Sequence, residues 1–304
     1  MISIYNSPMP LPRFQMSQRD ISALVPGEPL IAFKDVHLAF EEEVLRGISF
    51  EIWPSETKIL MGESGSGKTS IMKLAAGLIQ PDSGRIWVMG QDLAELTERE
   101  LLDFRRHLGF VFQEGALFDS LTVAENVAFR LREEKFDEAD IDARVREVLR
   151  FVELEHAIEL FPGELSGGMR RRVSIARALV DKPPVVFYDS PTAGLDPVTS
   201  QTIITLILRG RDLQGVTSIL ATHRVQDAFG LARFRFDEKT SHVVRVVSNG
   251  DGGKMPAAGE GATVSAPPTN VLVLRDGKVY FEGSAEEVLH SSDEYIKTFL
   301  LSAE

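Results

Sequence analysis

The residues best suited to chemistry form one stretch, Gly62-Glu63-Ser64-Gly65-Ser66-Gly67-Lys68-Thr69. This stretch matches the phosphate-binding pattern G-x-x-x-x-G-K-[ST] at every fixed position. In such a loop the glycines let consecutive backbone N–H groups turn inward around an anion, and the helix that follows adds its partial positive charge. We expect Lys68 to reach the β- and γ-phosphates of a nucleotide and the Thr69 hydroxyl to bind Mg²⁺. The alternative is a chance glycine turn followed by a lysine.

The neighbouring elements favour the phosphate-loop interpretation. Residues 58–61 (Lys-Ile-Leu-Met) predict a short buried strand. Residues 70–78 predict a helix, because their apolar side chains recur at helical spacing. Strand, glycine loop and helix in this order present the loop to a phosphate group.

Two further predicted strands end in residues that could act on a nucleotide. Residues 185–188 are apolar and lead to Asp189, and residues 217–221 lead to Thr222-His223. Ligands of α/β sheets bind at the carboxyl ends of the strands. Asp189 is therefore a candidate Mg²⁺ ligand of the Walker B type. A lone histidine is usually structural, but this position favours a functional role for His223.

A long helix is predicted from about residue 167 to residue 180, with Ser166 as its N-cap. Gly167 and Gly168 would allow close approach to the start of this helix. Taken alone, the pattern fits an ordinary capped helix equally well. The three arginines at 170–172 fit a solvated face.

The rest of the chain predicts the scaffold. Alternating residues at 30–40 and 46–53 predict antiparallel strands, with Phe40 just before a charged turn. The pattern alone makes Phe40 a core aromatic, and the alternative is a ring stacked on a nucleotide base. Other predicted elements are a strand at 85–89, a capped helix at 97–107, a strand at 109–112, a helical lobe over about 114–165 in which Asp137 caps one helix, a hairpin at 271–281 and helices at about 284–303. Residues 1–29 and about 248–269 are predicted to be extended or disordered, because they are rich in small residues, Pro and Ser.

The composition limits the class of partner. The chain has 304 residues, 43% of them hydrophobic, a net charge of −12 and no cysteine. An acidic protein is a poor match for nucleic acid, and the lack of cysteine excludes disulfides and cysteine-based metal sites. No apolar run approaches the ~18 residues that span a bilayer, and the proline-containing start does not resemble a signal peptide. We therefore expect a protein that is made and kept in the cytoplasm.

The order of these motifs resembles the ATPase subunits of ATP-binding-cassette (ABC) transporters over roughly residues 30–303. The stretch 62–69 is similar to the family's Walker A motif, 165–168 to its signature motif, 185–189 to Walker B and 193–196 to its D-loop. The resemblance implies an α/β P-loop NTPase fold of the ABC type over residues 30–283. This fold has a mixed sheet core, an antiparallel β subdomain and an inserted helical subdomain, and a helical tail would follow at 284–304.

The resemblance also assigns site residues. It implies a catalytic set of Lys68, Gln113, Ser190 and His223, a Mg²⁺ set of Thr69, Gln113 and Asp189, and a nucleotide-binding set of Phe40, Gly62, Glu63, Ser64, Gly65, Ser66, Gly67, Lys68, Thr69, Ser70, Ser166, Gly167, Gly168 and Asp196. Two copies of the chain would pair head to tail, with ATP and Mg²⁺ between the phosphate loop of one copy and the signature motif of the other.

The family pattern implies membrane partners as well. The helical lobe that follows Gln113 would dock on integral-membrane permease subunits, which places the chain on the cytoplasmic face of the inner or plasma membrane. A narrower resemblance covers 112–123 and 292–300, which are similar to the cassettes of Mla-type phospholipid transporters. Those systems work with MCE-domain lipid-binding proteins.

The chain departs from the family pattern at two places. The region 233–270 is longer than usual, and Ser190 follows Asp189 where the family normally has a glutamate. The leading hypothesis is an ATPase that powers lipid transport. An alternative is a nucleotide-gated module with little hydrolysis, because a serine hydroxyl cannot act as a carboxylate base. A soluble ABC protein of DNA repair or translation is a third class, disfavoured because the chain lacks a second cassette, a heptad coiled coil and a basic surface.

Overall fold

The structure is a computed structural model that describes residues 27–246 and 269–302. The two segments predicted to be extended or disordered, 1–29 and about 248–269, fall almost entirely outside these residues. The described residues form the mixed sheet core, the antiparallel sheet and the helical lobe that the sequence predicts.

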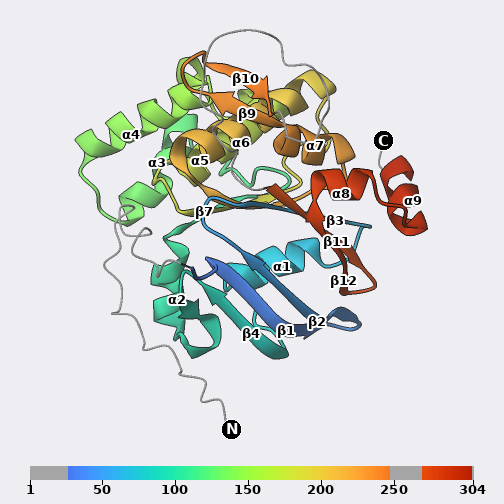
Figure 1. The fold of residues 1–304 in the computed structure, drawn as a ribbon. Helices are drawn as coiled ribbons and strands as arrows, with labels where there is room; N and C mark the ends of the chain where they lie inside the picture. The colour runs from blue at the N-terminus through green and yellow to red at the C-terminus, as the bar shows by residue number, and fades with distance from the viewer. Residues whose placement is uncertain (1–26, 247–268, 303–304) are drawn as a thin grey trace.

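A six-stranded mixed sheet lies at the centre of the molecule (Figure 1). Its order is β12-β11-β3-β8-β7-β6, and every neighbouring pair is parallel except β11 with β12. The strands are β3 Thr57–Gly62, β6 Leu108–Val111, β7 Val185–Asp189, β8 Thr217–Ala221, β11 Thr269–Arg275 and β12 Lys278–Ser284. All residues of β3, β7 and β8 are buried, as expected for parallel strands that are covered on both faces.

Alternate side chains of this sheet enter two different cores. On β7, Val186 and Tyr188 pack in one core, while Val185 and Phe187 pack in the other. The first core is shared with most of the helices, and the second with the antiparallel sheet and α1 (Lys68–Ala75). Each fully buried apolar side chain contributes about 1.5–3 kcal/mol. The period-2 pattern of the strands therefore fixes the sheet between two layers.

The antiparallel sheet has the order β2-β1-β4-β5 and covers one side of α1. Its strands are β1 Ile31–Ala39, β2 Glu43–Ile52, β4 Ser83–Val88 and β5 Gln91–Asp92. Phe33 and Phe50 stack across β1 and β2 with ring centroids 4.6 Å apart. The helix α2 (Glu98–Arg105) begins with the capping box that Thr97 and Glu100 predict.

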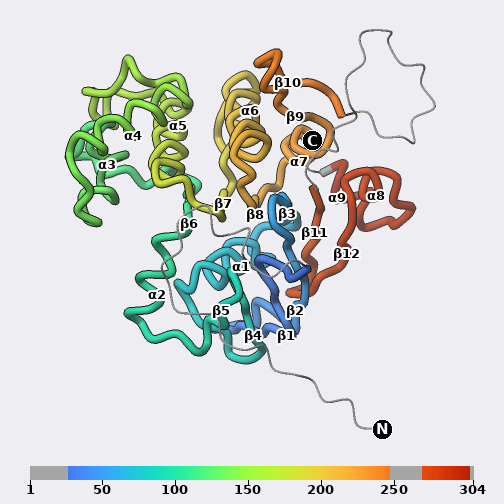
Figure 2. The backbone as a smooth tube through the Cα atoms, turned by 60° about the vertical axis from the view of Figure 1, so that its left-hand side comes forward, coloured from blue at the N-terminus to red at the C-terminus, as the bar shows by residue number. Residues whose placement is uncertain are grey.

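Three helices form a lobe beside the strands, and Figure 2 shows them grouped together. They are α3 Val123–Glu133, α4 Glu138–Phe151 and α5 Gly167–Leu179, and each contacts the other two. The helix α3 begins with a capping box formed by Thr122 and Glu125. Asp137 occupies the N-cap position of α4, but its side chain accepts no hydrogen bond there, so the predicted side-chain cap is wrong.

Several elements were not predicted from the sequence. They are α6 Pro197–Gln214, α7 Val225–Arg233 and the two-stranded sheet of β9 Phe234–Asp237 with β10 His242–Arg245. The buried Arg211 of α6 donates to the carbonyl oxygens of Leu231 (2.6 Å) and Phe234 (2.9 Å), and so joins α6 to α7 and β9. The predicted helical tail consists of α8 Ala285–Leu289 and α9 Glu294–Ser302.

Candidate nucleotide site

The phosphate loop connects β3 to α1, as predicted. Gly62, Gly65 and Gly67 have φ angles of 144°, 79° and 98°, a region that L side chains rarely adopt. A Cβ atom at Gly67 would lie 2.6 Å from Leu45 Cδ2, and one at Gly62 would lie 2.6 Å from the carbonyl oxygen of Leu274. Conformation and space therefore both require Gly62 and Gly67, while Gly65 is required by its conformation alone. Glu63, Ser64 and Gly65 form the exposed tip of the loop.

Lys68 lies folded over this loop. Its Nζ donates to the carbonyl oxygens of Gly62 (2.9 Å) and Glu63 (2.7 Å). Burial lowers the pKa of Lys68, and the nearby carboxylate of Asp189 opposes that shift. The ammonium group is thus held at the loop, next to the position that the loop offers to a phosphate.

Thr69 and Asp189 are 120 residues apart in the sequence, yet they meet in the structure. Thr69 Oγ1 donates to Asp189 Oδ2 at 2.9 Å. Gln113 follows β6, which pairs in parallel with β7, so it emerges at the same edge of the sheet as Asp189. Hydroxyl, carboxylate and amide oxygens are the ligands that Mg²⁺ prefers, usually together with substrate phosphates. The three predicted Mg²⁺ ligands therefore fit the ion chemically.

The signature helix α5 begins at Ser166, whose Oγ accepts from the backbone N–H of Met169 at 3.2 Å. A Cβ atom at Gly168 would collide with Cγ2 of Thr199 on α6. A Cβ atom at Gly167, in contrast, would make only ordinary van der Waals contacts, the nearest at 3.8 Å from Leu195 Cδ2. Gly168 is thus required for helix packing, while Gly167 leaves the helix start accessible.

Of the three arginines that the sequence suggested as a solvated face, only Arg170 is exposed. Arg171 is buried and donates to the carbonyl oxygen of Phe112 at 2.7 Å. Arg172 donates to the carbonyl oxygen of Val152 at 3.1 Å. Further along the same helix, Arg177 donates to the carbonyl oxygens of Gly115 and Ala116. Arg171 and Arg177 therefore hold the chain on both sides of Gln113 against α5, while Arg172 joins α5 to the end of α4.

Ser190 directly follows β7 and has a φ angle of 48°. Its N–H donates to the carbonyl oxygen of Ala221 at 2.9 Å, which joins this turn to the end of β8. Asp196 caps α6 by accepting from the N–H groups of Val198 and Thr199, both at 3.0 Å. The hydrogen bonds from Thr199 lower the pKa of Asp196. The Asp196 carboxylate is therefore occupied as a helix cap.

His223 is exposed at the end of β8, at the same edge as Ser190. Sequence reasoning missed the buried residues that surround it. Asp227 Oδ2 accepts from Thr192 Oγ1 through a short hydrogen bond and from Thr222 Oγ1 at 3.1 Å. Burial raises the pKa of Asp227, and these hydrogen bonds oppose the shift. An acidic residue four positions after the strand-end histidine was the available clue.

Phe40 lies at the turn between β1 and β2 and is 67% exposed. The core assignment that the pattern favoured is therefore wrong, because the turn carries the ring away from both cores. The turn leads to Val44 and Leu45, which lie beside Gly67 of the phosphate loop, and an exposed ring on this turn is free to stack on a base.

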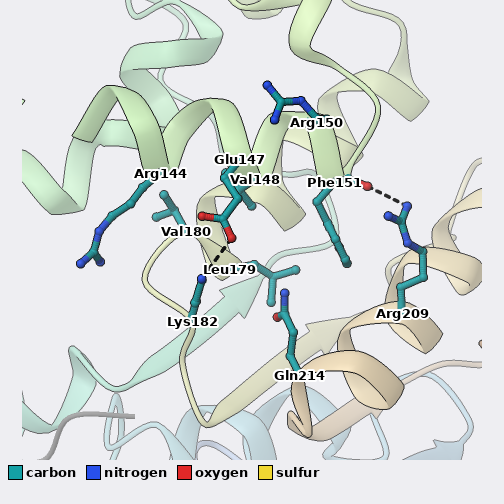
Figure 3. Close-up of a pocket in the computed structure, with 10 residues that line it drawn as sticks. All are labelled: Arg144, Glu147, Val148, Arg150, Phe151, Leu179, Val180, Lys182, Arg209 and Gln214. Carbon is teal, nitrogen blue, oxygen red and sulfur yellow. Dashed lines mark hydrogen bonds and ion pairs between the residues drawn. The ribbon is translucent and has the colours of Figure 1, made fainter. Parts of the chain in front are cut away.

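A cavity of about 270 Å³ lies elsewhere, between α4 and α6, as Figure 3 shows. Its lining includes residues just before β7 and at the end of α6, so it opens near the amino ends of strands whose carboxyl ends carry Asp189 and His223. Lys182 Nζ lies 3.0 Å from Glu147 Oε1, and Arg209 donates to the carbonyl oxygen of Phe151 at 2.9 Å. This cavity is separate from the nucleotide site.

Comparison with known proteins agrees with this geometry. Residues 45–193 match the family model described as ABC transporter. The chain is 32% identical over 254 residues to the intermembrane phospholipid transport system ATP-binding protein MlaF of Haemophilus influenzae, a match that covers 83% of each chain. The chain belongs to the ABC transporter family, as an ATP-binding subunit. It is also 34% identical to the chloroplastic protein TRIGALACTOSYLDIACYLGLYCEROL 3 of Arabidopsis thaliana, over 89% of this chain and 73% of that one.

Solved ABC structures share the fold. The dimeric post-hydrolysis structure of the ATP-binding cassette MJ0796, bound to ADP and Pi, has a TM-score of 0.67 and 27% identity, and the match covers 84% of this chain and 98% of that one. Further relatives are named for sulfate/thiosulfate import, methionine import and cell division, so the family as a whole serves many substrates.

Membership of this family makes the chain an ABC-type ATPase that uses ATP and Mg²⁺. When bound, the ion neutralises phosphate charge, and Thr69, Asp189 and Gln113 are the residues that fit it. ABC ATPase subunits pair as dimers and work with membrane permeases. Across residues 27–246 and 269–302, no helix combines the length and the apolar composition needed to cross a bilayer.

Proposed function

We propose that this chain powers a transporter of phospholipids, through ATP-driven head-to-tail pairing of two copies. The main support is the match to MlaF, which covers most of both chains and not only the nucleotide-binding motifs. In the proposed domain organisation, residues 30–283 form the ATPase domain with its helical lobe at about 114–165. Residues 284–304 form a C-terminal helical tail. The site residues inferred from the motifs keep the roles given above, and an MCE-domain protein is the proposed lipid-binding partner.

The proposed permease-docking surface comprises the exposed aromatic residues around the segment after Gln113. Phe118 and Phe129 are 43% and 40% exposed, and their ring centroids are 4.6 Å apart. The buried Asn126 side chain accepts from the N–H of Phe118 at 2.8 Å and donates to its carbonyl oxygen at 3.0 Å. A rigid frame thus presents large apolar rings, which is the composition of a protein interface core. The permease would hold the chain at the cytoplasmic face of the membrane.

Affinity purification from the native membrane tests this proposal. The chain should bring down integral-membrane subunits, and the purified complex should move a fluorescent phospholipid between vesicles in the presence of ATP. Phe118→Asp should abolish recovery of the permease, whereas Leu213→Asp, at a residue of similar exposure (40%) on α6, should not. A complex that transports sulfate or methionine instead would refute the lipid assignment, and recovery without any membrane subunit after crosslinking would refute the docking assignment.

A second candidate function rests on Ser190. Because no carboxylate follows Asp189, the chain could act as a module that closes on ATP and reopens slowly. Steady-state ATPase assay of the purified complex separates the two functions. A rate near the usual 1 s⁻¹ or more supports an ordinary motor. A rate about 10²–10⁴-fold lower supports the gated module.

A further inference from the structure

Two side chains at the amino end of α7 fix the turn that carries His223. They are those of Arg224 and Asp227. Arg224 Nη1 donates to Ser200 Oγ at 2.7 Å and to the carbonyl oxygen of Thr192 at 3.2 Å. Asp227 accepts from the hydroxyls of Thr192 and Thr222. Thr192, Thr222 and Asp227 are each at most 2% exposed. These five residues form one connected network, called here the Arg224–Asp227 network.

The network joins three segments that bear proposed site residues. Thr192 lies two residues after Ser190, Ser200 lies in the first turn of α6 that Asp196 caps, and Thr222 precedes His223. Thr222 Oγ1 also accepts from the N–H of Arg224 at 3.0 Å, so the backbone on both sides of His223 is held. His223 itself stays exposed toward the ligand edge.

Buried hydrogen bonds of this kind fix geometry more strongly than surface contacts, because breaking one leaves an unpaired polar group away from water. The position directly after Asp189 has no carboxylate to hold a water molecule, because it is Ser190, and the carboxylate of Asp196 caps α6. Phosphoryl transfer depends chiefly on positioning and on fixed charge. Because this chain lacks the usual base, its rate of hydrolysis depends more on the contacts that hold His223 and Asp196 in fixed positions relative to each other.

We propose that Arg224 and Asp227 are positioning residues for ATP hydrolysis, which hold His223 and the Asp196 turn in one fixed arrangement. Neither residue touches the nucleotide in this proposal. Each acts through its neighbours, Asp227 through Thr192 and Thr222, and Arg224 through Thr192 and Ser200. The inference rests on the ATPase activity of the family and not on the identity of the transported substrate.

Single-turnover hydrolysis of labelled ATP by the full-length chain tests the proposal, with the ATP Kd and the Tm measured on the same samples. Arg224→Ala and Asp227→Ala should each slow hydrolysis by about 10- to 100-fold, the size of effect expected from a misplaced catalytic group. Asp227→Asn should keep most of the rate, because its amide oxygen can accept the hydrogen bonds of both threonine hydroxyls. The ATP Kd should change by less than about threefold, because the phosphate loop is held separately by its own contacts. Arg224→Lys, which keeps the charge and one donor group, should recover most of the rate.

The matched control is Arg209→Ala. Arg209 also donates to a backbone carbonyl, that of Phe151, and stacks on the Phe151 ring at 4.4 Å, but it lies by the cavity at the other edge of the sheet. The Arg209→Ala variant should have a lower Tm than wild type but should hydrolyse ATP at the wild-type rate. The double variant Arg224→Ala/Asp227→Ala should be no slower than the slower single variant, because the two residues act as one unit.

Three results would overturn the proposal. An unchanged rate in both single variants would show that the network is only a structural brace, even if the Tm falls. A slower rate accompanied by an equal loss of ATP affinity would place the defect in nucleotide binding. Equal slowing by Arg209→Ala would show that the effect is a general consequence of lost stability. Arg224 is only partly buried, so Arg224→Ala is expected to fold even if Asp227→Ala does not.

Discussion

Two loops at the ligand edge of the sheet are held in different ways. The phosphate loop is held by itself: its glycines adopt left-handed angles, and Lys68 donates to carbonyl oxygens five and six residues away. The turn after Asp189 is held by side chains from elsewhere, since Arg224 and Asp227 lie 32 and 35 residues beyond Thr192. A self-contained loop can be read from one stretch of sequence, whereas a loop braced from outside cannot. Changes in the first loop should affect ligand affinity, and changes around the second should affect the rate of hydrolysis.

Lys68→Ala should have the largest effect on ATP affinity. Removing a charged donor from the loop should weaken ATP binding by about 10- to 100-fold, since hydrogen bonds of charged groups are worth about 1.5–3 kcal/mol. Nucleotide-dependent dimerisation should then disappear, as sedimentation in Mg²⁺ and ATP would show. Lys73→Ala, at an exposed lysine of the same helix, is the control and should leave both unchanged. Equal ATP affinity in wild type and Lys68→Ala would contradict the assigned role.

Ser190→Glu, in the second loop, should raise the rate of ATP hydrolysis. A carboxylate at this position should raise ATP turnover by at least about tenfold, a barrier change of roughly 1.4 kcal/mol. It should also shorten the lifetime of the ATP-bound dimer. Ser190→Gln, of the same size without the charge, should not raise turnover. If the unaltered chain already hydrolyses ATP at an ordinary rate and Ser190→Glu adds nothing, another residue is the base.

Gly168→Ala should test the packing behind the signature motif. The new methyl group would collide with Thr199 Cγ2, and overpacking of this kind typically costs about 1–3 kcal/mol. The Tm should fall accordingly. Adding Thr199→Ser should restore most of the loss, because it removes the colliding methyl group and keeps the hydroxyl that donates to Asp196. Gly163→Ala, with open space around the new methyl group, should change the Tm little.

Substituting Asp196 should have the smallest effect of these changes. The expected effect is a loss of stability that depends on pH. Its pKa is lowered in the folded chain, so its cap stabilises the fold above the ordinary Asp pKa of about 3.9. That stabilisation is lost as pH falls through the lower folded pKa. The Tm of Asp196→Ala should therefore lie below that of wild type at pH 7, and the gap should narrow below about pH 4. A gap that stays constant with pH would show that the charge of the cap is irrelevant.

The parts of this molecule that sequence could predict are those set by local rules. The glycine loop, the N-caps of α2 and α5 and the alternating strands each depend on residues within a few positions. The helix α6 escaped prediction because it is buried on most sides. Ile203, Ile204, Leu206, Ile207 and Leu208 leave no amphipathic stripe to recognise.

The misjudged residues share a different cause. Phe40 looked like a core residue because strand alternation extends up to it, but the chain turns first. Arg171 and Arg172 looked solvated because their partners are backbone carbonyls, which leave no trace in a pattern of side chains. The Arg224–Asp227 network joins residues that only tertiary structure brings together. Distant partners of this kind cannot be inferred from spacing alone.

The position of β3 in the sheet affects the order in which the newly made chain can fold. The strand that leads into the phosphate loop pairs on one side with β8 and on the other with β11, whose partner residues Thr57 and Thr269 are far apart in sequence. At ~5–20 residues per second, the ribosome needs roughly 10–40 s to make the chain between them. Until then β3 has an open edge, and the glycine loop at its end lacks the carbonyl of Leu274 that packs against Gly62. We therefore expect the phosphate loop to reach its full affinity for nucleotide only after the hairpin of β11 and β12 has emerged.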